Sequence, residues 1–92
     1  MATLIIPTPL RKFTDSKSIF EAEASTIKEL LEILSNEYEG IKPHLFNEVG
    51  ELRSFIRVYL GDEDINELDG VNTSIGNRDE VSIIPAIAGG SH

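Results

Sequence analysis

The pattern of apolar and polar residues predicts several short β-strands separated by polar turns. The first strand covers residues 3–7, which are rich in β-branched side chains, and Pro7 limits further pairing because proline lacks a backbone donor. The second covers residues 19–24, where Glu21 and Glu23 alternate with apolar residues that can share one face. We expect these two strands to pair as a hairpin.

Residues 55–60 also alternate, and the two faces of this strand differ in character. The aliphatic residues are expected to face the core: Ile56, Val58 and Leu60. The other three are expected to share the opposite face: Phe55, Arg57 and Tyr59. After a turn at residues 61–64, we expect Ile65 to begin a short edge segment and residues 81–85 to form the last strand.

One helix is predicted between the second and third strands. Five apolar residues recur at spacings of three and four, which places them on one stripe of a helix: Ile27, Leu30, Leu31, Leu34 and Tyr38. Thr26 and Glu29 have the spacing of a capping box, and Ser25 is the alternative cap. Gly40 is suited to the C-terminal stop.

The predicted elements follow the order strand, strand, helix, strand, short strand, strand. This order fits an α+β roll of β-grasp (ubiquitin-like) type, in which a mixed sheet has one main helix packed across one face. Residues 41–53 are expected to form a long connection with one helical turn near residues 44–47. The first and last strands are expected to lie side by side in the middle of the sheet. The domain would then cover residues 1–86, and residues 87–92 would form a flexible C-terminal tail.

Composition narrows the function classes. A chain of 92 residues is long enough for one compact core but not for a second domain. The formal charge of -8, from 16 acidic and 8 basic residues, would repel nucleic acid and favours a basic protein surface as partner. The chain has no cysteine, which excludes disulfides and thiolate chemistry. It also lacks an apolar run long enough for a membrane span, so we expect a soluble cytoplasmic protein.

Common catalytic and metal-binding patterns are missing from the sequence. A lone His44 beside Pro43 is more typical of a loop residue than of a ligand. The acidic run at residues 62–64 lacks the spacing of a calcium loop, so we interpret it as a solvated turn. No metal or bound cofactor is therefore expected. The unusual feature that remains is the end of the chain, where Gly89 and Gly90 precede Ser91-His92.

Two segments of the chain resemble the MoaD/ThiS family of ubiquitin-like sulfur carriers, which end in Gly-Gly. They are residues 58–65 (VYLGDEDI) and residues 79–90 (DEVSIIPAIAGG), and they are most similar to the CysO-like branch that supplies sulfur for cysteine synthesis. The start Ile5-Ile6-Pro7 and the long connection after the helix also suit that branch. Only the last ten or so residues of this resemblance form a specific motif.

The resemblance implies a function in which Gly90 is the working residue. An ATP-dependent activating enzyme of the E1-like (MoeB/ThiF) type would adenylate its backbone carboxylate, and sulfur would then replace AMP to leave a thiocarboxylate. ATP would be used by that enzyme, and a synthase would accept the sulfur, so this chain would be a protein cosubstrate and not an enzyme. Ala88, Gly89 and Gly90 would thread into the partner, since glycine has no Cβ and fits a narrow channel.

Two further expectations concern the partners. The family contacts its activating enzyme through the residue at the position of Ile84, and strand alternation extends this surface to Phe55, Arg57 and Tyr59, with Ile87 in the tail. Packing at an edge or in the core is an equally good reading of the three strand residues. Ser91-His92 would block Gly90; it is either a precursor extension removed by a JAMM-type metalloprotease or a cloning remnant.

Other functions stay open at this point. The same tail would suit the small subunit of molybdopterin synthase. It would also suit a ubiquitin-like modifier joined through Gly90 to lysines of target proteins. A passive interaction domain is the third alternative, in which removal of Gly89 and Gly90 changes nothing.

Overall fold

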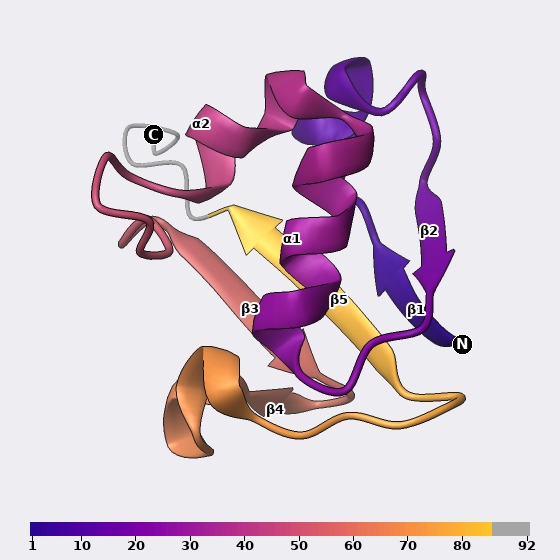
Figure 1. Cartoon of the computed structure of the whole chain (residues 1–92), viewed down its shortest axis with the longest axis vertical. Helices are drawn as coiled ribbons and strands as arrows, with labels where there is room; N and C mark the ends of the chain where they lie inside the picture. Colours follow the sequence, from indigo (N-terminus) through magenta and orange to yellow (C-terminus); the bar gives the residue numbers. More distant parts are fainter. Residues whose placement is uncertain (86–92) are drawn as a thin grey trace.

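The computed structural model of the protein describes residues 1–85, and these form a five-stranded sheet with one main helix across one face (Figure 1). The strands are β1 (Ala2–Ile5), β2 (Ile19–Ala22), β3 (Ile56–Leu60), β4 (Glu63–Asp64) and β5 (Glu80–Pro85). The helices are α1 (Ile27–Glu37) and α2 (Lys42–Leu45). Short 3-10 helices cover Thr8–Phe13, Glu39–Ile41, Ile65–Glu67 and Gly70–Asn72.

The sheet is mixed, with the strand order β2-β1-β5-β3-β4. β1 and β5 are parallel neighbours, while the pairs β1–β2, β3–β5 and β3–β4 are antiparallel. The first and last strands therefore lie side by side, with β5 at the centre of the sheet. This confirms the predicted β-grasp fold, including the hairpin of the first two strands.

The core lies between the sheet and α1. The four aliphatic residues of the predicted helical stripe are fully buried: Ile27, Leu30, Leu31 and Leu34. Tyr38 packs against the core from the end of the helix, edge to face with Phe20 of β2 at 6.2 Å between ring centroids. Ile56 and Val58 face this core from β3, as alternation predicts. Within residues 1–85, no helix has both the length and the apolar character that a membrane crossing requires.

The N-terminus of α1 has the predicted cap. The Thr26 hydroxyl oxygen accepts a hydrogen bond of 3.2 Å from the Glu29 N–H. The Glu29 carboxylate in turn accepts one of 2.6 Å from the backbone N–H of Ser25, one residue before the position that a standard capping box uses. Thr26 is thus the N-cap, and Ser25 contributes through its backbone.

Several predicted boundaries were wrong. The first two strands end at Ile5 and Ala22, each two residues earlier than predicted. Gly40 does not stop α1, because the helix ends at Glu37 and Gly40 lies inside the 3-10 turn that follows. The helical turn after it is α2, two residues earlier than expected. Ile65 does not begin an edge strand: the Asp64 carboxylate accepts a hydrogen bond from the Asn66 N–H and caps a 3-10 helix, which turns Ile65 into the core. The predicted domain boundary after residue 86 lies outside the described residues.

Candidate functional site

The end of β5 fixes the root of the C-terminal tail. β5 pairs on one side with β1 and on the other with β3, where Pro85 lies opposite Ile56. Its alternate residues Val81 and Ile83 are buried in the core. The last described residue, Pro85, is therefore part of the central strand of the sheet. The predicted tail residues Ile87, Ala88, Gly89 and Gly90, with Ser91-His92, lie outside the described residues.

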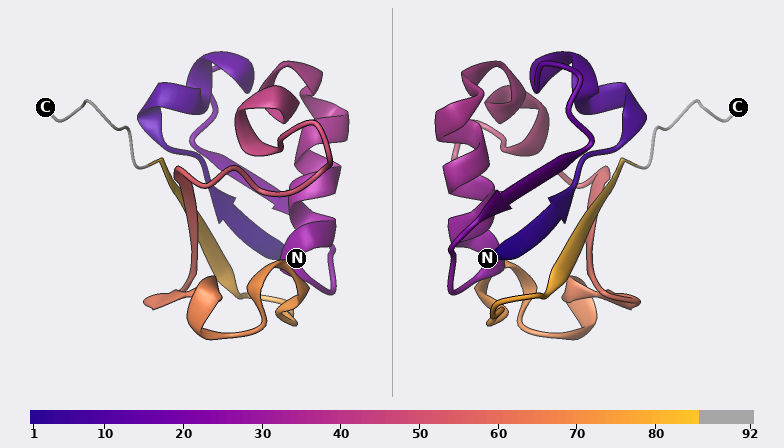
Figure 2. Two further views of the ribbon diagram at one scale, coloured as in Figure 1. Left: turned by 90° about the vertical axis from the view of Figure 1, so that its left-hand side faces the viewer. Right: turned by 90° about the vertical axis from the view of Figure 1, so that its right-hand side faces the viewer.

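The face of the sheet opposite α1 carries most of the predicted partner-binding residues, and the two turned views show that the helices lie on the other side (Figure 2). Ile84 is 48% exposed, whereas its neighbour Ile83 is 2% exposed. Ile84 lies directly opposite Arg57 in the β3–β5 pair, and Tyr59 lies opposite Ser82. We call this surface the open face. The structure thus brings Arg57, Tyr59 and Ile84 together.

Phe55 lies at the margin of the open face. It belongs to the turn before β3, where the Ile56 N–H donates to the Arg53 carbonyl at 3.0 Å, and its side chain is 44% exposed. The Arg53 guanidinium lies 6.0 Å from the centroid of its ring, at the outer limit of a cation–π contact. Core packing of Phe55, which the sequence left open, is excluded by this exposure.

Two apolar residues of the open face were missed by sequence reasoning. Ile19 of β2 is 52% exposed and pairs with Ile5 of β1, which in turn pairs with Ser82 of β5. Ile5 lies between two fully buried neighbours, so it faces away from the core. The signal was present, because Ile19 alternates with the inward residues of its strand, but only the strand order shows that it lies on the same face as Ile84.

Arg57 is held in place by an ion pair with Asp64. Its Nη1 lies 3.2 Å from the Asp64 carboxylate, and this is the only salt bridge within residues 1–85. The Arg57 side chain is 54% exposed, so solvent screens the pair and its contribution to stability is at most about 1 kcal/mol. Its structural effect is to orient one cation between the aromatic and aliphatic groups of the open face.

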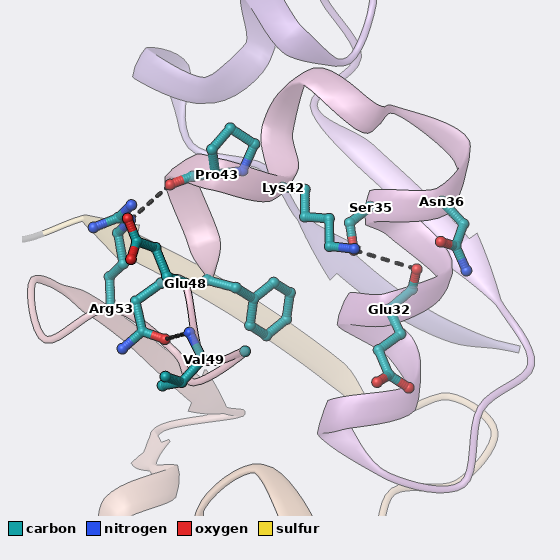
Figure 3. Close-up of a pocket in the computed structure, with 11 residues that line it drawn as sticks. Glu32, Ser35, Asn36, Lys42, Pro43, Glu48, Val49 and Arg53 are labelled. Atoms are coloured by element: carbon teal, nitrogen blue, oxygen red, sulfur yellow. Dashed lines mark hydrogen bonds between the residues drawn. The ribbon is translucent and has the colours of Figure 1, made fainter.

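A hollow of the described chain lies elsewhere. It has a volume of about 800 Å³ and lies between α1, α2 and the segment 46–53 (Figure 3). Its charged lining residues are balanced in sign: Glu32, Glu48, Lys42 and Arg53. None of the predicted partner-binding residues lines it, and a balanced lining does not select an ionic ligand.

His44 takes part in aromatic packing. It lies in α2 and its ring stacks on that of Phe13, with 4.2 Å between the ring centroids. Among residues 1–85 no group of three or more potential metal ligands occurs.

Comparison with known proteins decides the family. The sequence model of the ThiS family matches residues 4–90. The chain belongs to the ThiS family. It is 36% identical to the sulfur carrier protein CysO of Mycobacterium tuberculosis, over 96% of this chain and 97% of that protein. The fold of this ThiS-family chain aligns with a chain of the Amycolatopsis orientalis BexX/CysO complex at a TM-score of 0.88 and 34% identity, covering 96% and 98% of the two chains.

A third relative belongs to another functional class. The chain is 30% identical to small archaeal modifier protein 3 of Haloferax volcanii, over 87% of this chain and 88% of the relative. The family membership and the resemblance to CysO predicted from the sequence are therefore confirmed, and this ThiS-family chain is a homologue of a sulfur carrier.

Proposed function

We propose that this protein carries sulfur as a thiocarboxylate on Gly90, for use in the synthesis of cysteine or a related metabolite. The observation that carries the proposal is the 36% identity to CysO over nearly the whole chain, together with a family match that extends to the Gly89-Gly90 pair. The match ends at Gly90, and any residues that follow it, such as Ser91-His92, would have to be removed before the Gly90 carboxylate can react.

The proposed chemistry takes place in a partner enzyme that supplies ATP. A carboxylate oxygen of Gly90 attacks the α-phosphorus of ATP, pyrophosphate leaves, and an acyl adenylate forms. A sulfide then attacks the acyl carbon and displaces AMP, which leaves the C–S bond of the thiocarboxylate. The chain itself contributes no catalytic group to these steps. It acts as a protein cosubstrate for an E1-like activating enzyme and for the synthase that accepts the sulfur.

The fold supports this role through the position of β5. A strand with a neighbour on each side and two buried side chains is a rigid root, so a partner that binds the open face also fixes where the tail begins. The exposed apolar residues of the open face suit a protein partner, since buried aromatic and aliphatic groups with arginine dominate such interfaces. The BexX/CysO complex shows that a relative of similar fold binds another protein.

Intact-mass spectrometry tests the proposal. A chain that ends at Gly90 is incubated with the MoeB/ThiF-type enzyme of the same organism, ATP and sulfide. We expect a product heavier than the acid by the difference between one sulfur and one oxygen atom. The matched control is the full chain ending in Ser91-His92, which should stay unmodified because its Gly90 carboxylate is a peptide carbonyl. An unmodified Gly90-terminated chain, with an enzyme that is active on ATP, would contradict the proposal.

The relationship to small archaeal modifier protein 3 favours one second candidate, a modifier joined to target lysines. An acyl adenylate at Gly90 is the common intermediate, since a lysine amine can displace AMP as sulfide does. Digestion of cell proteins and a search for lysines bearing the C-terminal residues through an isopeptide bond would detect this function. Free thiocarboxylate without such adducts would favour the carrier function.

A further inference from the structure

The two edges of the sheet differ in how well they are closed. β4 is only two residues long, and the chain then turns into the 3-10 helix Ile65–Glu67. β2 is longer, and within residues 1–85 no strand lies on its outer side (Figure 1). Natural sheets commonly protect such an edge with a proline or a bulge, and Ile19–Ala22 contains neither. β2 is therefore the edge at which another strand can pair.

The backbone of β2 presents unpaired groups at this edge. The Ile6 N–H donates to the Ser18 carbonyl at 2.8 Å, so Ser18 and every second residue after it face β1. The Thr3 N–H donates to the residue before β5 at 2.9 Å, so its partner Glu21 is not hydrogen-bonded to β1. The N–H and C=O groups of Ile19 and Glu21 therefore point outward, and within residues 1–85 no backbone group bonds to them.

The side chains along this edge are apolar on the side of α1. Phe20 and Ala22 of β2 are partly buried and pack against the core, and Ala24 continues the same row. Tyr38 meets the Phe20 ring edge to face and is also only partly buried. On the opposite side of the strand, the Ile19 side chain is 52% exposed. A strand added to β2 would thus place alternate side chains against the Phe20 ring and against Ile19.

Two carboxylates decide which strand fits this edge. Glu21 lies in β2 and Glu23 follows the strand, and both side chains are exposed. Within residues 1–85, neither forms a salt bridge. A second copy of the chain that paired β2 with β2 would bring these carboxylates together, and like charges on opposite strands are unfavourable. A strand that carries lysine or arginine opposite Glu21 gains an ion pair instead.

We propose that the outer edge of β2 is a docking site for an extended segment of a partner protein in which aliphatic residues alternate with lysine or arginine. The segment adds a sixth strand to the sheet. Its backbone bonds to Ile19 and Glu21, its aliphatic side chains face Phe20 and Ala22, and its basic side chains lie opposite the glutamates. In this mode main-chain hydrogen bonds give affinity and side chains give specificity.

The site is separate from the proposed thiocarboxylate chemistry. β1 lies between β2 and β5, so a strand added at β2 leaves the root of the tail accessible. The inference therefore goes beyond the proposed function and does not depend on it.

Peptide titration of the full 92-residue chain tests the site. The probe is a peptide of about seven residues in which valine and lysine alternate, and the control peptide has glutamate in place of lysine. We expect the amide NMR signals of Ile19 and Glu21 to shift most. The control peptide should bind at least about tenfold more weakly at low salt, because like charges then meet at the edge.

Substitutions at one position separate charge from backbone pairing. Glu21→Gln should weaken binding about threefold, whereas the same change at Glu32, which is exposed on α1, should not alter it. Glu21→Pro also removes the outward N–H but no bond to β1, so we expect affinity about fivefold below that of Glu21→Gln. Melting curves and the amide signals outside β2 check that the Glu21→Pro chain is folded.

A second pair of peptides probes the backbone bonds without a change in the protein. One carries N-methyl groups on its lysines and the other on its valines, so only one of them keeps the N–H groups that face β2. We expect that peptide to bind as the unmodified probe does and the other to lose at least about tenfold in affinity.

Four results would overturn the inference. The first is no detectable binding of the valine–lysine peptide. The second is that the largest shifts fall on α1, and the third is that Glu21→Gln and Glu32→Gln weaken binding equally; either would mean that a cation is attracted to an acidic chain without a site. The fourth is equal affinity of the two methylated peptides, which would exclude strand pairing. Each of these outcomes leaves the test of the proposed function unaffected, because none involves Gly90.

Discussion

Two neighbouring isoleucines on β5 separate the stability of the fold from binding of the partner. Ile83 faces the core and is 2% exposed, whereas Ile84 faces the open side and is 48% exposed. Both side chains have the same volume and lie on the same strand, so Ile83→Ala and Ile84→Ala remove the same atoms. We predict different outcomes: Ile83→Ala lowers stability strongly and spares partner binding, whereas Ile84→Ala lowers stability only slightly and weakens partner binding.

The effect on folding follows from burial. Truncation of a buried isoleucine to alanine costs about 2–5 kcal/mol because transfer energy is lost and a cavity is left. A domain of this length has roughly 5–14 kcal/mol of stability, so Ile83→Ala remains folded or becomes marginal. For Ile84, about half of the three removed carbons are in contact with the protein, and at about 0.8 kcal/mol per buried methylene the cost is about 1 kcal/mol. These values correspond to falls in Tm of roughly 8–40 °C for Ile83→Ala and 4–8 °C for Ile84→Ala.

The predicted loss of partner binding follows from the exposed half of the Ile84 side chain. If the partner covers it, the truncated side chain loses about 1 kcal/mol of burial in the complex, which raises KM about fivefold. In the proposed function the chemical step takes place at Gly90 and not at Ile84, so kcat should not change. Urea denaturation gives the stabilities, and pyrophosphate release with the activating enzyme gives the kinetic constants. Both are measured at a temperature where at least nine-tenths of each variant is folded.

The reasoning would be refuted by one pattern in particular. If Ile84→Ala left KM unchanged while Ile83→Ala raised it, the partner would not bind the open face, and the exposed side chain would have no role in recognition. A loss of several kcal/mol of stability in Ile84→Ala would contradict the assignment of this residue to the outer face of the sheet.

The remaining predictions concern local backbone structure. Thr26→Ala should lower the free energy of unfolding by about 1 kcal/mol in urea denaturation, because the first turn of α1 loses its acceptor, whereas Ser25→Ala should cost less since Ser25 donates through its backbone N–H. Gly50→Ala should destabilise the protein by roughly 1 kcal/mol, because the φ of Gly50 is +86° and alanine disfavours this conformation. Gly40→Ala should be neutral or slightly stabilising, since the added Cβ would meet Phe13 at an ordinary contact distance of 3.6 Å. An equal effect of the two substitutions in thermal melts would disprove this contrast.

Periodic segments of the fold were predictable from sequence, and irregular ones were not. The α1 stripe and the alternation of β3 depend on spacing alone, so burial follows directly from the order of residues. Ile65 was misplaced because its position depends on a hydrogen bond from the backbone N–H of Asn66 to the Asp64 carboxylate. This bond competes with strand pairing and leaves no periodic trace in the sequence. Gly40 was misplaced because the helix ends in a 3-10 turn that needs no left-handed residue.

The candidate site was predictable only where one strand supplied it. Arg57, Tyr59 and Ile84 follow from alternation within β3 and β5, but Ile19 joins them through the strand order, which alternation does not contain. The pairing of Thr3 with Glu21 and with Glu80 also depends on the strand order, since these residues are far apart in sequence and meet only in the folded sheet.

One central strand serves three purposes in this molecule, and under the proposed function this allows the partner enzyme to supply the catalytic side chains. The backbone of β5 is held by β1 and β3, its inner residues Val81 and Ile83 pack in the core, and its outer residue Ile84 is exposed on the open face. A partner bound to the outer face is thereby in register with the root of the tail, because both belong to one rigid strand. Under the proposed function, the geometry that catalysis needs is supplied when the two proteins dock, and the carboxylate of Gly90 is sufficient as the reacting group.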